Sequence, residues 1–151
     1  MAVCLIGLPN TRMIHYLNHE EFPTVSICTP TFNRRPFIPA LIECVVNQTY
    51  PANRLEWIIV DDGTDPVGDL FANVPIARYV RYPEKMTLGK KRNITNDLCA
   101  GNIIIYMDDD DYYPEERVEH AVEKLTGPTT DGLGFFTSLL TSLVNNGKVS
   151  A

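Results

Sequence analysis

The sequence lacks a membrane-spanning hydrophobic run, a CxxC pair and an excess of basic residues. The apolar start at residues 1–8 is too short for a transmembrane helix and has no basic leader, so we expect neither a membrane span nor a signal peptide. Without CxxC spacing, the 4 cysteines are expected to be buried thiols, which favours a reducing, cytoplasmic location. The net charge of −6 argues against nucleic-acid binding, because neutralising phosphates requires clustered Lys and Arg.

The length and hydrophobic content fit one globular domain with a sizeable core. The chain has 151 residues, of which 44% are hydrophobic, and a second full domain has no room. We expect an N-terminal arm at 1–23, a folded domain at 24–126, and a linker with an apolar tail at 127–151. The tail keeps helical spacing between residues 136 and 144, so packing on a sheet edge, self-association into a homo-oligomer and truncation of a longer chain are all open.

Hydrophobic spacing predicts strands that alternate with helices. Thr87 is expected to cap the second helix, with Ile94 and Leu98 on its apolar side. The expected strands lie at 25–28, 57–60, 76–80 and 102–107, and the expected helices at 38–46, 88–100 and 114–126, the last with a stripe of Val118, Ala121, Val122 and Leu125. This alternation predicts an α/β fold with a mainly parallel sheet flanked by helices.

Three of the expected strands end in conspicuous polar segments. These segments are Thr29–Arg34, Asp61–Thr64 and Asp108–Asp111. Parallel sheets bind ligands beyond the carboxyl ends of their strands, so one pocket built from all three segments would explain them together.

The four consecutive aspartates predict a metal site. If the chain stays extended, Asp108 and Asp110 converge while Asp109 faces away. Carboxylate oxygens suit Mn²⁺ or Mg²⁺, which keep positions open for water and for nucleotide phosphates. The alternative is a solvated acidic loop; strong repulsion between neighbouring carboxylates favours the metal.

Four ordered motifs resemble those of the family 2 glycosyltransferases. They are VSICTPTFNR from Val25, IVDDGT from Ile59, GKKRN from Gly89 and YMDDDD from Tyr106. The resemblance covers roughly residues 24–125 and implies a Rossmann-like nucleotide-diphospho-sugar transferase fold of the glycosyltransferase A type, truncated to its donor-binding half.

The resemblance also assigns expected roles to residues in the nucleotide-sugar pocket. Pro30 and Phe32 would line the base pocket, and Asp62 would accept a hydrogen bond from the base. Asn33 and Arg34 belong to the same donor-binding set. Other roles are expected for neighbouring residues: Asp61 forms a turn, and Asp111 caps its loop. Lys90 and Lys91 either contact the donor or form a solvated helix face.

The family's Asp-x-Asp motif matches Asp108 and Asp110, with Asp110 the better candidate for direct metal ligation. Asp109 would neighbour the ribose or the metal, and Arg92 could reach the diphosphate or the donor sugar.

Two other protein classes share parts of this pattern. The YMDD tetrapeptide also occurs in reverse-transcriptase palms, but these place it on a hairpin, whereas here Pro114 begins a helix. Nicotinamide-binding Rossmann domains require a GxGxxG turn after the first strand, where this chain has TPTFNR.

The predicted function is metal-dependent, inverting transfer of a sugar from a nucleotide-diphospho-sugar to a carbohydrate, lipid or protein acceptor that the sequence does not specify. Such transfer needs a carboxylate base, which the family supplies well downstream of the aspartates. After Pro128 the only carboxylate is Asp131, which lies too near the preceding helix, so we expect the base to be missing. The alternative is a non-catalytic module that binds nucleoside diphosphates or self-associates.

Overall fold

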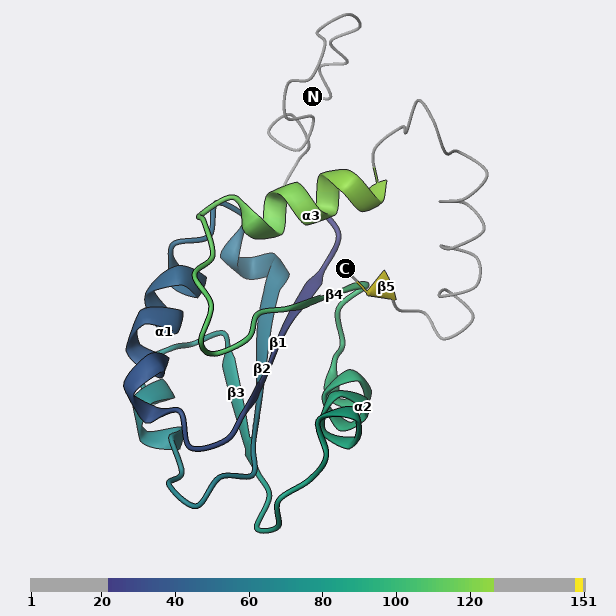
Figure 1. Cartoon of the computed structure of the whole chain (residues 1–151). Coiled ribbons are helices and arrows are strands. Elements are labelled where there is room, and N and C mark those ends of the chain that lie inside the picture. The colour runs from purple at the N-terminus through teal and green to yellow at the C-terminus, as the bar shows by residue number, and fades with distance from the viewer. Residues whose placement is uncertain (1–21, 127–148, 151) are drawn as a thin grey trace, which may run out of the picture.

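A parallel β-sheet forms the centre of the molecule (Figure 1). The computed structural model describes residues 22–126 and 149–150. Within these ranges the sheet has 5 strands in the order β3-β2-β1-β4-β5, and each neighbouring pair is parallel. The strands are β1 (Val25–Thr31), β2 (Leu55–Asp61), β3 (Ala77–Arg81), β4 (Ile103–Tyr106) and β5 (Val149–Ser150). The predicted α/β fold with a parallel sheet is therefore confirmed.

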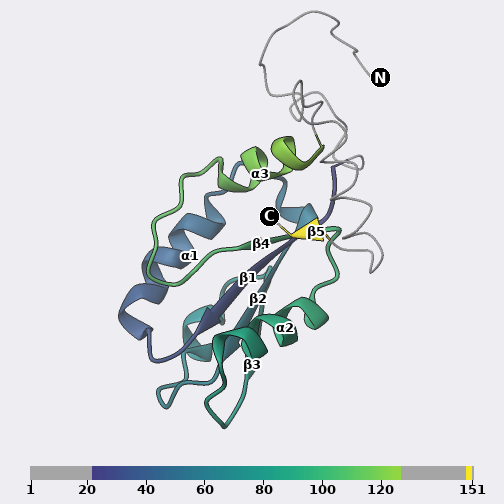
Figure 2. The ribbon, with the colours of Figure 1, turned by 45° about the vertical axis from the view of Figure 1, so that its right-hand side comes forward.

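Three α-helices of the described chain cover the two faces of the sheet. They are α1 (Ile38–Val46), α2 (Leu88–Leu98) and α3 (Arg117–Thr126); short 3-10 turns lie at η2 (Arg35–Phe37), η3 (Ala52–Arg54) and η4 (Gly68–Phe71). In Figures 1 and 2, α1 and α3 lie on one face and α2 lies on the other. Such coverage of both faces is typical of all-parallel sheets, because the crossover connections between their strands place helices there.

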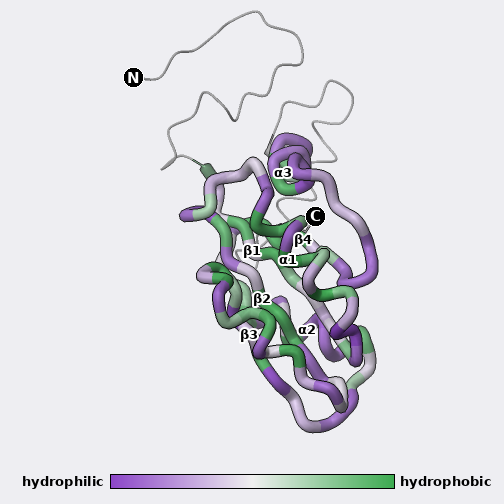
Figure 3. The backbone as a smooth tube through the Cα atoms, turned by 90° about the vertical axis from the view of Figure 1, so that its left-hand side faces the viewer, coloured by the Kyte–Doolittle hydropathy of each residue, from purple (hydrophilic) through white to green (hydrophobic). Residues whose placement is uncertain are grey.

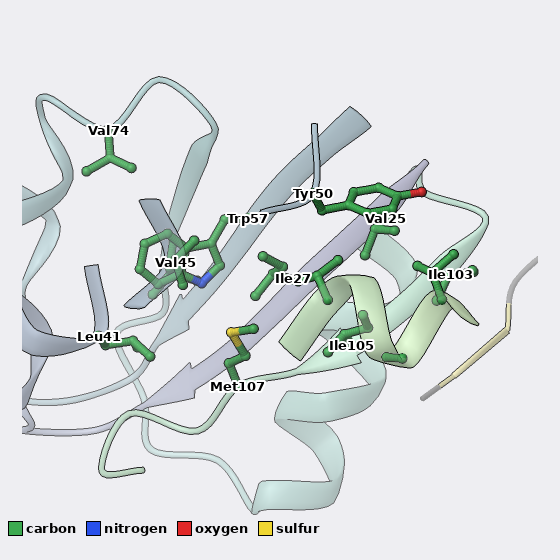
Figure 4. Packing of buried hydrophobic residues seen from close by; sticks show 14 of the residues in the cluster. Val25, Ile27, Leu41, Val45, Tyr50, Trp57, Val74, Ile103, Ile105 and Met107 are labelled. Carbon is green, nitrogen blue, oxygen red and sulfur yellow. The ribbon is translucent and has the colours of Figure 1, made fainter. Parts of the chain in front are cut away.

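The central strand β1 is buried along its whole length because helices cover both of its sides. On the α1 and α3 side, Ile27, Trp57 and Ile105 pack against α1 residues such as Leu41 and against the predicted α3 stripe (Figure 4). On the α2 side, a smaller cluster consists of Cys28, Ile58, Val60, Cys99 and Ile104. Figure 3 shows hydrophobic segments gathered along the strands, with hydrophilic segments in the outer loops. The continuous apolar runs in the sequence thus mark strands buried on both faces.

Hydrogen bonds of Thr29 join the three inner strands near their carboxyl ends, where the polar loops begin. The indole Nε1 of Trp57 donates to Thr29 Oγ1 at 2.9 Å, and that hydroxyl donates to the carbonyl oxygen of Met107 at 2.7 Å. All three groups are buried, so these two hydrogen bonds fix how β1, β2 and the end of β4 lie relative to one another.

The element boundaries differ from the sequence-based expectations at several points. The first strand continues through Pro30 to Thr31 rather than ending at Cys28, and α3 begins at Arg117 rather than at Pro114. Thr87 caps α2 as predicted, with its side chain accepting from the backbone N–H of Lys90 at 3.3 Å.

The apolar face predicted for α2 is not the face that packs most deeply. Ile94 and Leu98 are half-buried, whereas Lys91 and Thr95 are buried. The physical reason is that Lys91 finds polar partners beneath the helix, described below. Strand β5 adds an edge strand from within the predicted tail. Residues 1–21 of the arm predicted at 1–23, and the helical spacing at 136–144, lie outside the described residues.

Candidate functional site

The polar segments that follow β1, β2 and β4 meet at one edge of the sheet (Figure 2). The strands are parallel and adjacent, so their carboxyl ends lie together; Thr31 pairs with Asp61 in the ladder, and Met107 N donates to the Cys28 carbonyl at 3.0 Å. The side chain of Thr31 then reaches across to the aspartate loop, where Oγ1 donates to Asp109 Oδ2 at 2.7 Å. The structure therefore brings all three segments into one region.

Asn33 joins the loop after β1 to the loop after β2. Its backbone has a positive φ of 54°, a conformation that Asn tolerates better than most residues. Its Oδ1 accepts from the backbone N–H groups of Thr64 at 2.7 Å and Asp65 at 3.1 Å. A Cβ on Gly63 would lie 2.6 Å from both the backbone nitrogen and Oδ1 of Asn33, so glycine is needed there. The predicted contact of Asn33 with a donor remains a prediction; in this structure its side chain builds the loop.

Asp61 shapes the second loop, as expected from its turn position. Its carboxylate accepts from Gly63 N at 2.8 Å, Val67 N at 3.1 Å and the Tyr79 hydroxyl at 2.6 Å, and the residue is fully buried. Burial, together with the hydrogen bond to Asp61, raises the pKa of Tyr79 to about 12. Asp61 is thus a structural anchor whose hydrogen-bonding capacity is directed into the loop.

Asp62 forms a buried ion pair with Lys91 of α2. Lys91 Nζ donates to Asp62 Oδ1 and, at 3.0 Å, to the carbonyl oxygen of Thr31, while Asp62 Oδ2 accepts from Met86 N at 2.6 Å. Burial opposes ionisation of Asp62, but the hydrogen bonds from Lys91 and Met86 and the charge of Lys91 outweigh it, so the pKa of Asp62 lies below its ordinary value. Lys91 thereby connects the ends of β1 and β2 to α2.

Sequence reasoning left the role of Lys91 open between donor contact and solvation. The structure excludes the solvated alternative, because only 6% of the residue is exposed. Lys90, its neighbour, is exposed. Lys91 and Thr95 lie four residues apart and share the buried face of α2, but Lys90 shares a face with Ile94 in the same way, so helical spacing gave no signal that separates the two lysines.

Phe32 presents an aromatic ring at the mouth of this region. Lys85 Nζ lies 4.5 Å from the ring centroid and Lys91 Nζ lies 5.9 Å from it, both within the range of cation–π attraction. The segment that carries Lys85 also lines a cavity of about 340 Å³, formed by residues 82–87 and Lys90. Pro30, expected beside Phe32, is buried within β1. Contact of either residue with a base stays a prediction.

The aspartate segment does not continue as an extended chain. Strand β4 ends at Tyr106, and the chain turns at Asp109 and Asp110. The alternation of side chains predicted for Asp108 to Asp110 required an extended chain, so its premise is wrong. Asp108 lies near Arg92, with Oδ1 3.9 Å from Nη2, whereas Asp110 lies near Arg34, with Oδ2 3.5 Å from Nη2. The two predicted metal ligands therefore take different cationic partners.

Asp109 is the buried member of the segment. Besides accepting from Thr31, its Oδ1 lies 3.8 Å from Arg34 Nε. Burial raises the pKa of Asp109 above its ordinary value, and the neighbouring Asp108 and Asp110 add to this, although Thr31 and Arg34 act in the opposite direction. Asp111 is exposed and accepts from the Tyr113 hydroxyl at 3.4 Å. The hydroxyl oxygen of Tyr113 in turn accepts from Asp108 N at 2.6 Å.

Arg92 is held at the rim by Tyr106. Its guanidinium lies 5.0 Å from the Tyr106 ring centroid, and the Tyr106 hydroxyl donates to Asn96 Oδ1 at 2.6 Å. Within the described part of the chain, the buried Nε of Arg92 has no hydrogen-bond partner. Arg34 is similarly placed over Phe37, at 5.5 Å from the ring centroid. Two guanidinium groups thus face the aspartates from β1's loop and from α2.

The carboxylate oxygens of the aspartates suit a hard divalent cation, although the aspartates do not surround a closed metal site. Across residues 22–126 and 149–150, no group of three or more His, Cys, Asp or Glu side chains is arranged to hold a metal ion. Mg²⁺ and Mn²⁺ commonly use only one or two protein carboxylates and complete their shell with water and substrate phosphates. Asp108 and Asp110 are half-exposed, with side-chain exposures of 43% and 46%, so their oxygens are accessible for such a role.

Sequence comparisons identify relatives of this chain. The profile of the family described as Glycosyl transferase family 2 matches residues 26–137. The glycosyltransferase TuaG of Bacillus subtilis is 28% identical over 106 residues, which are 67% of this chain and 41% of TuaG. The glycosyltransferase EpsJ of the same organism is 30% identical over 120 residues, covering 76% of this chain and 34% of EpsJ. The chain thus spans less than half of the length of these relatives.

Solved structures share the same architecture. The mannosyltransferase PcManGT of Pyrobaculum calidifontis, solved with GDP-Man and Mn²⁺, superposes with a TM-score of 0.66 at 24% identity over 74% of this chain and 35% of that protein. Residues 1–349 of Staphylococcus aureus TarS, solved with UDP-GlcNAc, give 0.60 at 25% identity over 65% of this chain and 30% of that one. These likenesses confirm the expected nucleotide-diphospho-sugar transferase fold.

The described helices are all too short or too polar to cross a bilayer. The four sequence motifs, the parallel sheet with polar loops at the carboxyl ends of its strands, and the matched profile, which covers more than half of the sequence, agree with one another. The chain belongs to glycosyl transferase family 2.

Proposed function

We propose that this chain binds a nucleotide-diphospho-sugar together with Mn²⁺ or Mg²⁺ and forms the donor-binding half of an inverting glycosyltransferase. One observation carries the proposal: the ends of β1, β2 and β4 bring a phenyl ring, a buried carboxylate and an aspartate segment to the same edge of the sheet. A phenyl ring can stack on a base, a carboxylate can accept from a base N–H or a ribose hydroxyl, and an aspartate segment can bind the metal that a diphosphate requires. The bound UDP-GlcNAc of TarS supports this class of ligand.

The aspartates would hold the metal on the diphosphate side. In this proposal Asp108 and Asp110 supply ligand oxygens, and Asp109, fixed by Thr31, lies beside the metal or the ribose. A divalent cation bound there would neutralise the charge of the leaving diphosphate. Arg34 and Arg92, which now face Asp110 and Asp108, would turn their planar N–H groups to phosphate oxygens.

The base would bind near Phe32. The ring offers a stacking face, Pro30 two residues earlier would line the same pocket, and Asp62 offers an acceptor for a ring N–H. Because Asp62 is fully covered and already accepts from Lys91 and Met86, a base reaches it only if the segment around Met86 moves aside. Donor binding in this proposal therefore includes a shift of residues 82–87.

A thermal-shift panel tests the proposal. UDP, GDP, CDP and dTDP are each added with and without Mn²⁺, and we expect at least one of them to raise Tm in a concentration-dependent manner when Mn²⁺ is present. Inorganic diphosphate with Mn²⁺ is the control, since it lacks base and ribose. If none of the four nucleotides raises Tm beyond this control, the proposal is wrong.

Turnover is expected to be weak in this chain. A general base contributes roughly 10²- to 10⁴-fold in rate, and no carboxylate of the described residues is assigned to that role; Asp131 lies outside them. We therefore expect donor binding with little acceptor-dependent release of nucleoside diphosphate, measured by a coupled assay with a broad acceptor mixture. Robust turnover that Asp131→Asn leaves unchanged would show that another residue or a partner subunit supplies the base.

A further inference from the structure

Two buried cysteines face each other between the sheet and α2. Cys28 lies in the middle of β1 and Cys99 directly follows α2, and their Sγ atoms are 3.1 Å apart although the residues are 71 positions apart in the sequence. Cys28 is 0% exposed and Cys99 is 4% exposed. Both are present as thiols. The donor-site proposal uses neither of them.

The surroundings of the pair fix both sulfur atoms. They belong to the apolar cluster on the α2 side of the sheet, with Ile58, Val60 and Ile104. Cys99 Sγ donates to the Thr95 carbonyl oxygen at 3.1 Å, which holds this side chain against the last turn of α2. A disulfide needs its sulfurs about 2.05 Å apart, so each side chain has to move only a fraction of an ångström.

We propose that Cys28 and Cys99 form a reversible disulfide that fastens α2 to the central strand. The oxidant would be a small neutral peroxide, because burial of both sulfurs keeps larger disulfide reagents away. One thiol attacks the peroxide, breaks its O–O bond and becomes a sulfenic acid, releasing water. The second thiol then displaces that hydroxyl as a second water. Overall, two S–H bonds are exchanged for one S–S bond, and hydrogen peroxide is reduced to two molecules of water.

The bond would act on the helix that supports the site. Cys99 follows Lys91 and Arg92 of α2 by about two helical turns, and Cys28 precedes Thr31 on β1 by three positions. A cross-link over 71 residues restricts the unfolded chain strongly. We expect the oxidised protein to melt roughly 5 °C or more above the reduced protein.

Mass spectrometry of the full chain tests the proposal directly. After treatment with hydrogen peroxide, the intact mass should fall by two hydrogen atoms, non-reducing peptide maps should show Cys28 linked to Cys99, and dithiothreitol should restore the mass and the original Tm. Cys44→Ala is the matched control, because Cys44 lies on α1 at the other face of the sheet and its removal should leave the link intact. Cys99→Ala should abolish the link.

The wild-type peptide map decides the proposal even if Cys99→Ala fails to fold. A link from either sulfur to Cys4 or Cys44 would overturn it. So would sulfinic acid on Cys28 or Cys99 in place of the cross-link, or oxidation of Cys44 under conditions in which the pair stays reduced.

Discussion

The ammonium of Lys91 and the carboxylate of Asp62 form an ion pair that is almost completely withdrawn from solvent, with side-chain exposures of 7% and 0%. The same ammonium donates to the Thr31 carbonyl oxygen at 3.0 Å. One lysine therefore holds together the ends of two strands and the helix that covers them. The proposed base side of the site therefore depends on a residue that is almost completely buried.

Replacing Lys91 should destabilise the protein strongly. Lys91→Met keeps the length of the side chain but leaves the Asp62 carboxylate buried without its cation, which costs about 3–5 kcal/mol in free energy of unfolding. Lys90→Met is the matched control, since Lys90 is exposed, and its effect should stay within about 0.5 kcal/mol. Urea unfolding of both variants measures this difference. Equal stabilities would show that the buried pair contributes nothing.

The same pair predicts the response of stability to acid. The pKa of Asp62 is lower in the folded protein than in the unfolded chain, so the unfolded state binds the proton first as pH falls. The stabilisation from Asp62 is therefore complete above the unfolded pKa of about 4 and is lost as pH falls through the folded value. Asp62→Asn should flatten the decrease in free energy of unfolding below about pH 4. A variant with the wild-type slope would contradict this assignment.

Metal-assisted nucleotide binding should depend on Asp110 and not on the adjacent Asp111. Asp110→Ala removes a proposed ligand and should abolish the effect of Mn²⁺ on nucleotide affinity, whereas Asp111→Ala should leave it largely intact, because Asp111 is exposed and is contacted by Tyr113. Titration calorimetry of each variant with Mn²⁺ and nucleoside diphosphate provides the comparison. Equal loss in both variants would place the metal elsewhere on the loop.

The sheet could be predicted because its strands carry their own signal. Runs such as Trp57–Val60 are apolar throughout and rich in β-branched residues, which is typical of a strand buried on both faces. The helical spacing of Val118 to Leu125 likewise identified the apolar face with which α3 packs on the sheet. The cap at Thr87 was also predictable, since a Thr before a helical segment supplies the missing acceptor.

The details of the site depend on tertiary contacts that no local pattern specifies. Burial of Lys91 follows from Asp62, which is 29 residues away in sequence, and a run of basic residues does not distinguish it from Lys90. The orientation of the aspartates depends on where β4 stops, and the ends of an element are the part of it that local sequence specifies least. The amide oxygen of Asn33 also accepts from the neighbouring loop, a contact that its position in the sequence did not predict; its contact with a donor stays a prediction.

The central claim is that metal and nucleoside diphosphate bind to this chain together. Titration calorimetry with whichever diphosphate raises Tm most, run first with Mn²⁺ and then with EDTA, tests it most directly. Each ligand neutralises charge that the other would meet, so their binding should be mutually favourable, and we predict an affinity at least about 5-fold higher with Mn²⁺. An affinity that EDTA leaves unchanged would contradict the account.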